Sequence, residues 1–137
     1  MIEVSREDLV LMMESGFINL RLGKFAEALA IFEGVMSLSP ESEVPMVAIG
    51  SVYFGQLKYD QAIVHYRKAL KKKPDSAFAR AYLGESLFFI GKKEDALGEL
   101  QKASDIEPSG KSGDFARVLL DAIRGGYVPS GQISAGA

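Results

Sequence analysis

The sequence of 137 residues contains no cysteine and only one histidine, and both facts limit the catalytic and metal-binding sites that the chain can form. Without cysteine the chain cannot form disulfides, thiolate nucleophiles or cysteine metal sites. No apolar run is long enough to span a membrane. The start, Met1 to Asp8, lacks the basic region that precedes the apolar core of a secretory signal. We therefore expect a cytoplasmic protein with no membrane insertion.

Catalytic motifs are also missing. The sequence shows no Gly-rich phosphate loop, serine nucleophile motif or pair of acids at catalytic spacing, and its acidic residues have no metal-ligand spacing. His65, the only histidine, lies on the outward face of a predicted helix, where it is a surface side chain or, alternatively, a ligand or base. We expect no enzyme activity, no catalytic residue, no metal and no cofactor.

Charge is distributed in bands along the chain. Residues 1–43 carry eight acids and three bases, residues 44–74 one acid and six bases, and residues 75–108 seven acids and four bases. A basic band therefore lies between two acidic ones. This arrangement weighs against nucleic acid as a partner, because binding phosphates requires a coherent basic face.

A repeat of 34 residues runs through the sequence three times. Glycine, alanine and proline recur at this step, at Gly16, Gly50 and Gly84, at Ala28, Ala62 and Ala96, and at Pro40, Pro74 and Pro108. Leu29, Ile63 and Leu97 keep the same step. A fixed period of this length indicates a stacked helical solenoid, in which each helix pair buries its apolar face against its neighbours.

Helix boundaries follow from caps and breakers. Ser5 followed by Asp8 resembles a capping box, Gly23 and Gly91 interrupt helices, and Asp75 or Ser76 can cap the helix after Pro74. Repeats are predicted at about 9–42, 43–76 and 77–110, within a single domain of residues 1–126. A capping helix is predicted at about 112–125, and residues 127–137, rich in Gly, Ser and Ala, are predicted to be a flexible tail.

These residues resemble the tetratricopeptide repeat family over positions 9–110. The family pattern places small residues where the two helices of a repeat cross, here the glycines and alanines named above. Bulky residues occupy the helix-B position at Phe32, Tyr66 and Leu100. The resemblance implies an all-α, right-handed superhelical solenoid of three helix pairs plus a C-terminal capping helix.

In this family the first helices of the repeats line a concave groove, which implies a protein-binding site. The matching positions here are mostly apolar and include five phenylalanines. The predicted partner-binding residues are Val10, Met13, Phe17, Leu20, Val44, Val47, Phe54, Phe78, Ala81, Phe88 and Phe89. Arg21, Ser51, Gly55 and Glu85 also map to this face. Phe17, Phe54 and Phe88 are expected to form one continuous surface.

Two interpretations of the phenylalanines stay open. If they are half-exposed, the apolar patch reaches several hundred Å², about the limit for a soluble monomer, and an apolar or amphipathic client segment should cover it. Alternatively, several of them pack between helices and the groove is shallow. The clamp for acidic C-termini in co-chaperones of this family is absent, since its positions hold Met13, Phe17, Ala48, Phe78 and Tyr82.

Small size, three repeats and an apolar groove are similar to the chaperones of bacterial type III secretion, and the short N-terminus resembles the needle-subunit type. A small-residue stripe in the second predicted helix, Ala26, Ala30, Gly34 and Ser37, fits a second interface with another protein or a homodimer mate, or tolerated drift. The functional hypotheses are a chaperone or adaptor that sequesters a client segment, a scaffold in a multiprotein complex, and a self-associating protein.

Overall fold

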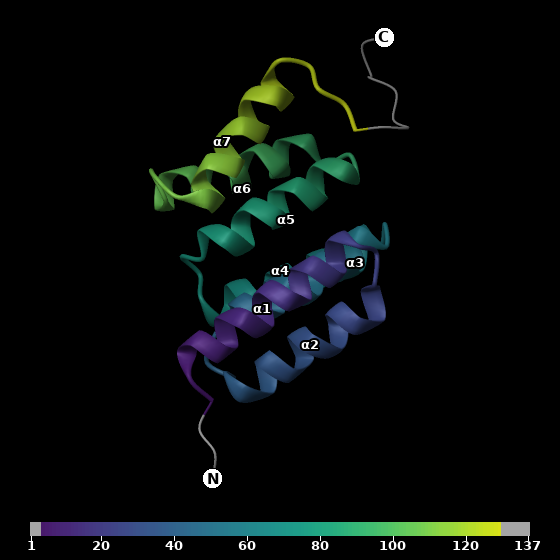
Figure 1. Ribbon diagram of the computed structural model, residues 1–137. Helices are drawn as coiled ribbons and strands as arrows, with labels where there is room; N and C mark the ends of the chain where they lie inside the picture. Colours follow the sequence, from purple (N-terminus) through teal and green to yellow (C-terminus); the bar gives the residue numbers. More distant parts are fainter. Residues whose placement is uncertain (1–3, 130–137) are drawn as a thin grey trace.

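A computed structural model describes residues 4–129, and this part of the chain contains seven α-helices and no strand. The all-α helical solenoid is confirmed. The helices are α1 (Arg6–Arg21), α2 (Phe25–Leu38), α3 (Val44–Gly55), α4 (Tyr59–Lys72), α5 (Ala77–Phe89), α6 (Lys93–Ile106) and α7 (Lys111–Arg124). Successive pairs follow one another along the stack, with α2 at one end and α7 at the other (Figure 1).

Two of the predicted serine caps are present. The Ser5 hydroxyl accepts a hydrogen bond from the Asp8 amide at 3.1 Å, and the Ser76 hydroxyl accepts one from the Ala79 amide at 3.1 Å. At the start of α7 the Glu107 carboxylate takes this role and accepts the Gly113 amide at 2.7 Å. In each case a side chain satisfies an amide that has no partner within its own helix.

Each helix pair is held at one close crossing, where a glycine of the first helix meets a large buried side chain of the second. A Cβ atom built on Gly16 would lie 2.3 Å from the Phe32 ring, and one on Gly50 would lie 2.5 Å from the Tyr66 ring. In the third pair a Cβ on Gly84 would lie 2.7 Å from Leu100. The 34-residue step of these glycines therefore reports the packing distance within each pair.

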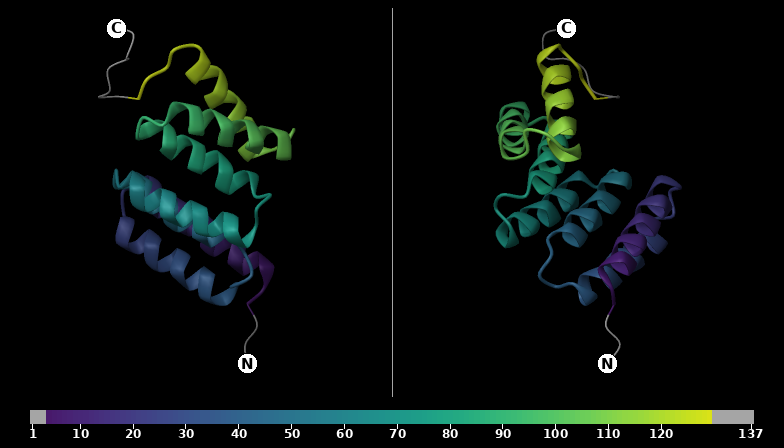
Figure 2. Two further views of the ribbon diagram at one scale, coloured as in Figure 1. Left: turned by 180° about the vertical axis from the view of Figure 1, so that it is seen from behind. Right: turned by 60° about the vertical axis from the view of Figure 1, so that its left-hand side comes forward.

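The contacts between pairs place the first helices on the inner side of the stack. Helix α1 contacts α3, α3 contacts α5 and α5 contacts α7, whereas α2, α4 and α6 do not contact one another within residues 4–129. The first helices are thus closer together than the second helices, and this difference curves the stack. Figure 2 shows the successive pairs from two further sides. The concave face is formed by α1, α3 and α5.

The buried core has two parts. The larger cluster joins α3 to α7 and includes Tyr66, Leu83 and Leu100, while a smaller one joins α1, α2 and α3 around Phe32 and Val52. Gly16 is the only buried residue of α1. The first helix therefore contributes little to the core and leaves much of its apolar surface exposed.

The turns between the two helices of each pair share a left-handed residue at the 34-residue step. Gly23 and Gly91 adopt φ angles of 75° and 86°, and Leu57 at the corresponding place in the second pair adopts 64°. A Cβ atom makes this conformation costly for residues other than glycine. Leu57 therefore combines backbone strain with a side chain that is 71% exposed.

We expect Gly84→Ala to destabilise the protein by about 1–3 kcal/mol, because the added methyl group meets the buried Leu100 side chain. The matched control is Gly98→Ala in α6, where no atom lies within 4 Å of the added carbon. That change should stabilise the helix by about 1 kcal/mol. Urea unfolding of the two variants measures both effects, and equal shifts in the same direction would contradict the assigned crossing.

Leu57→Gly should raise the free energy of unfolding by about 0.5–1 kcal/mol, since relief of the left-handed strain outweighs the added freedom of the unfolded chain. The reverse change, Gly91→Leu, should lower it. A Cβ on Gly91 meets no atom within 4 Å, so strain alone is tested there. Thermal unfolding monitored by circular dichroism gives both values, and a loss of stability in Leu57→Gly would refute the prediction.

Candidate functional site

A pocket lies at the N-terminal end of the concave face, between α1, the end of α2 and the start of α3. Its volume is about 380 Å³. We call it the N-terminal pocket; its lining residues are Arg6, Leu9, Val10, Met13, Glu14, Phe17, Val35, Ser39, Ser42, Val44 and Pro45. Most of these side chains are apolar, so the pocket favours an apolar ligand surface.

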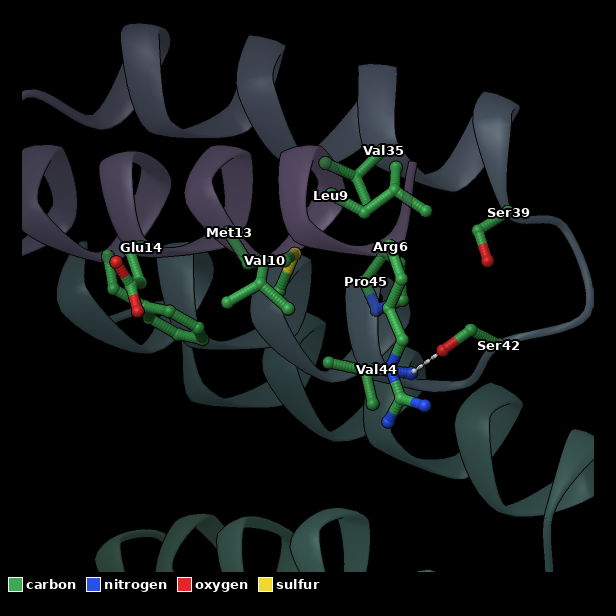
Figure 3. Close-up of a pocket in the computed structure, with 11 residues that line it drawn as sticks. Arg6, Leu9, Val10, Met13, Glu14, Val35, Ser39, Ser42, Val44 and Pro45 are labelled. Carbon is green, nitrogen blue, oxygen red and sulfur yellow. Dashed lines mark hydrogen bonds between the residues drawn. The ribbon is translucent and has the colours of Figure 1, made fainter. Parts of the chain in front are cut away.

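The view in Figure 3 shows how the helices build the N-terminal pocket. Val10 and Met13 project from α1 toward Val44 and Pro45 at the start of α3. The Ser42 hydroxyl accepts a hydrogen bond from the Val44 amide at 3.2 Å, which fixes the chain as it enters α3. The Arg6 side chain extends beside Val44 at one end. The N-terminal pocket is therefore polar at this end and apolar along the rest of its lining.

A second pocket, the central pocket, crosses the middle of the concave face and has a volume of about 290 Å³. All three repeats contribute to it. Its lining residues are Phe17 and Leu20 of α1, Ser51, Phe54 and Gly55 of α3, Tyr66 of α4, and Tyr82 and Glu85 of α5. Phe17 lines both pockets, so the two adjoin. Together they form what we call the groove.

Glu85 is the only charged residue that lines the central pocket. Burial raises the pKa of its carboxyl from 4.5 to about 7, because removal from water disfavours the charged form. Within residues 4–129 no group forms a hydrogen bond or ion pair with this carboxylate. The central pocket therefore contains an acidic group without a partner.

Two hydroxyl groups lie at the base of the central pocket. The Ser51 Oγ and Tyr66 hydroxyl are 3.2 Å apart, within hydrogen-bond distance, and Ser51 also donates to the Val47 carbonyl at 3.2 Å. Burial raises the pKa of Tyr66 and of Tyr82, and the nearby Glu85 charge acts in the same direction. Both phenols therefore stay neutral and able to donate hydrogen bonds at ordinary pH.

Six of the eleven predicted partner-binding residues line the groove: Val10, Met13, Phe17, Leu20, Val44 and Phe54. Three others, Val47, Ala81 and Phe88, are buried in the core, so the sequence was misleading there. All three belong to the larger core cluster, which joins α3 to α7. Phe88 therefore does not continue the surface formed by Phe17 and Phe54, and the groove is narrower than the predicted patch.

The remaining two predicted residues, Phe78 and Phe89, are half-buried and pack against other rings. Phe89 lies 5.2 Å from Phe54 and 5.4 Å from Tyr59, measured between ring centroids, and these three rings close one edge of the groove. Phe78 lies 5.3 Å from Tyr82. Since the Phe54 ring has partners on two elements, part of the aromatic surface serves the fold itself.

Tyr66 and Tyr82 are site residues that the sequence interpretation missed. The family pattern gives Tyr66 a role in helix packing, and its side chain is fully buried, yet it also forms part of the wall of the central pocket. Tyr82 lies one helical turn before Glu85 on the same helix, and this spacing places the two side chains on one face. The spacing therefore predicts that Tyr82 lines the same surface as Glu85. The predicted concave positions Ser51, Gly55 and Glu85 do line the central pocket.

Outside the groove, the small-residue stripe of α2 is open: Ala26, Ala30 and Ser37 are exposed and Gly34 is half-buried. The expectation for His65 needs correction, because its ring is half-buried and stacks on Tyr53 with centroids 5.0 Å apart. Burial and Lys68 lower the pKa of His65. Residues 4–129 contain no cluster of three or more potential metal ligands.

The chain after α7 turns back toward α5. Tyr127, the first residue of the predicted tail, lies with its ring centroid 5.8 Å from that of Phe88. The rest of the predicted flexible tail, residues 130–137, lies outside the described residues. None of the helices in the described part is long and apolar enough to cross a membrane.

Comparisons with known proteins agree with this geometry. The family model described as "TPR repeat" matches residues 50–91, which cover the first helix of the third repeat and most of the second pair. No protein of curated function matches the sequence. The match identifies residues 50–91 as similar to tetratricopeptide repeats, and the helix pairs on either side keep the same 34-residue step.

Several solved structures share the fold. The type III secretion translocator chaperone SycD from Yersinia enterocolitica is 18% identical with a TM-score of 0.73, over 88% of this chain and 92% of that one. Pseudomonas aeruginosa PcrH, in complex with the chaperone-binding region of PopB, is 16% identical with a TM-score of 0.71, over 90% and 99%. The first TPR domain of human RPAP3 is 22% identical with a TM-score of 0.72, over 85% and 90%.

The raised pKa of Glu85 predicts how the stability of the free protein depends on pH. Its folded pKa of about 7 exceeds the ordinary value of 4.5, so the folded chain holds the proton more tightly than the unfolded chain. Stability should therefore fall as pH rises from about 4.5 to 7, by roughly 2–3 kcal/mol from this group. Glu85→Gln should remove this component.

Urea unfolding of the parent and Glu85→Gln across this pH range measures the effect as the difference between two curves. Other titrating groups, including His65, are present in both proteins and cancel. The variant should be the more stable protein at pH values above about 7, because it buries no charge. Parallel curves would show that water reaches the carboxyl freely.

Proposed function

We propose that the protein is a non-enzymatic, protein-binding chaperone or adaptor of the cytoplasm that holds an apolar or amphipathic segment of a client in its groove. The observation that carries this proposal is the continuity of the N-terminal and central pockets across the first helices of all three repeats. A surface of this shape suits a helix or extended segment with regularly spaced apolar anchors.

The similar structures support a client of this kind. Two of them are type III secretion chaperones, and PcrH is described with a segment of PopB bound. Our finer proposal is that this chain is also a type III secretion chaperone. The needle-subunit type stays our prediction, although SycD is described as a translocator chaperone. Identities below 20% mean that this likeness establishes the fold alone.

Self-association is the second candidate function, and one observation favours it. Leu11 and Ile18 of α1 and Leu22, which directly follows this helix, are 62%, 48% and 65% exposed. Helix α1 belongs to the first pair of the stack, and among the helices of residues 4–129 only α2 and α3 contact it. A second copy could cover this surface. Sedimentation over a concentration series measures this directly, and a dimer that Leu11→Glu dissociates would support the second candidate.

Val10→Glu should abolish client binding while leaving the fold intact. Val10 lines the N-terminal pocket and is 48% exposed, so a glutamate there stays solvated in the free protein but meets an apolar surface in the complex. The expected loss of affinity is about tenfold or more, since binding would bury an unpaired charge. The matched control is Val64→Glu on α4, because Val64 is 51% exposed and lines neither pocket.

The measurement is co-purification from the native cells, with the bound client identified by mass spectrometry and its affinity then measured for each variant. We expect one abundant client with the parent and with Val64→Glu, and none with Val10→Glu. The client produced alone should aggregate and become soluble on co-expression. Loss of binding in Val64→Glu alone would place the interface on the outer face and overturn the proposal.

A further inference from the structure

The central pocket contains a carboxyl group, that of Glu85, for which the described residues supply no basic partner. Phe17, Leu20 and Phe54 line the same pocket as Glu85, and the lining also includes the hydroxyl-bearing residues Ser51, Tyr66 and Tyr82. A carboxylate withdrawn from water is costly unless it is paired, and buried charges in proteins are usually paired or hydrogen-bonded. An apolar client segment alone would bury Glu85 further and increase this cost.

The described part of the chain, residues 4–129, offers no cation for this position. No lysine or arginine lines the central pocket. Arg80, on the same helix as Glu85, is already paired with Glu99 at 2.8 Å and donates to the Pro74 carbonyl at 3.0 Å. Residues 130–137 have the sequence Ser-Gly-Gln-Ile-Ser-Ala-Gly-Ala and contain no basic residue. A cation that pairs with Glu85 must therefore come from another molecule.

We propose that the central pocket binds one lysine or arginine side chain, which the client presents within an otherwise apolar segment. The inference rests on the proposed function and specifies its client further. The aliphatic stem of such a side chain would lie against Phe17 and Phe54, and its charged head would reach Glu85. The Ser51 oxygen can accept a further hydrogen bond from it, and the Tyr82 ring offers a cation–π surface.

This arrangement gives the groove selectivity as well as affinity. Apolar contacts in the N-terminal pocket accept many side chains, whereas a buried carboxylate rejects any segment that leaves it unpaired. The selected segment thus has apolar anchors and one basic residue at a fixed spacing from them. An acidic residue at that place would be excluded by like-charge repulsion.

The test is selection of peptides from a displayed library of random sequences of about four helical turns. The parent, Glu85→Gln and Glu14→Gln are used as separate targets. Glu14→Gln is the matched control, because it removes an exposed carboxylate from the N-terminal pocket of the same groove. We expect apolar peptides with one enriched lysine or arginine for the parent and the control. For Glu85→Gln we expect apolar peptides without that enrichment.

A selected peptide is then synthesised in two forms, one with lysine and one with norleucine, which keeps the stem and lacks the ammonium group. Calorimetry should show that Glu85→Gln weakens the lysine peptide by about tenfold or more and does not weaken the norleucine peptide. For the parent, the lysine peptide should bind more tightly at about pH 8 than at about pH 6, because ionised Glu85 is the form that pairs.

The outcomes separate this inference from the function on which it rests. Apolar peptides with no basic preference for the parent would overturn the inference and leave the proposed function standing. If no selected peptide loses affinity in Val10→Glu, both the inference and the proposed function would be overturned. If Glu85→Gln still selects peptides with a lysine or arginine, another acidic residue pairs with that cation, and the inference is refuted. A dimer that Glu85→Gln alone dissociates would show that a second copy fills the pocket, and would also refute the inference.

Discussion

The close contact between a glycine of the first helix and a large side chain of the second is the constraint on which the rest of the structure depends. Gly50 faces the Tyr66 ring so closely that no Cβ atom fits, and Gly16 and Gly84 face Phe32 and Leu100 in the same way. This contact sets the distance within each helix pair. Because it recurs at a fixed step, the pairs have the same internal geometry and can stack on one another.

Stacking of equal pairs leads directly to the groove. The first helices contact one another along the stack and the second helices do not, so the first helices form the inner face. On that face, side chains that do not reach a neighbouring pair stay half-exposed and line the two adjoining pockets. The curvature of the stack thus forms the groove. At one edge of the groove, the rings of Phe54, Tyr59 and Phe89 pack together.

Two positions reduce the stability of the free protein. Glu85 is withdrawn from water without a partner in the described part of the chain, and its protonation near pH 7 is the consequence. Leu57 holds an exposed apolar side chain in a left-handed turn where the other two repeats have glycine. Neither feature helps the isolated molecule. Such features are typical of surfaces that are completed by a partner.

The sequence by itself determined the repeat and the helices, and it predicted which helices line the concave side of the stack. The step of Gly16, Gly50 and Gly84 is a property of the sequence, and helix period and caps are local, so both can be predicted without coordinates. Only the tertiary structure decided which groove positions stay open. Val47 and Phe88 fit the concave pattern as well as Val10 does, but their burial depends on packing against neighbouring helices. Tyr66 and Glu85 likewise belong to different repeats and line the same pocket. Their proximity depends on how the repeats stack, and no local sequence pattern encodes it.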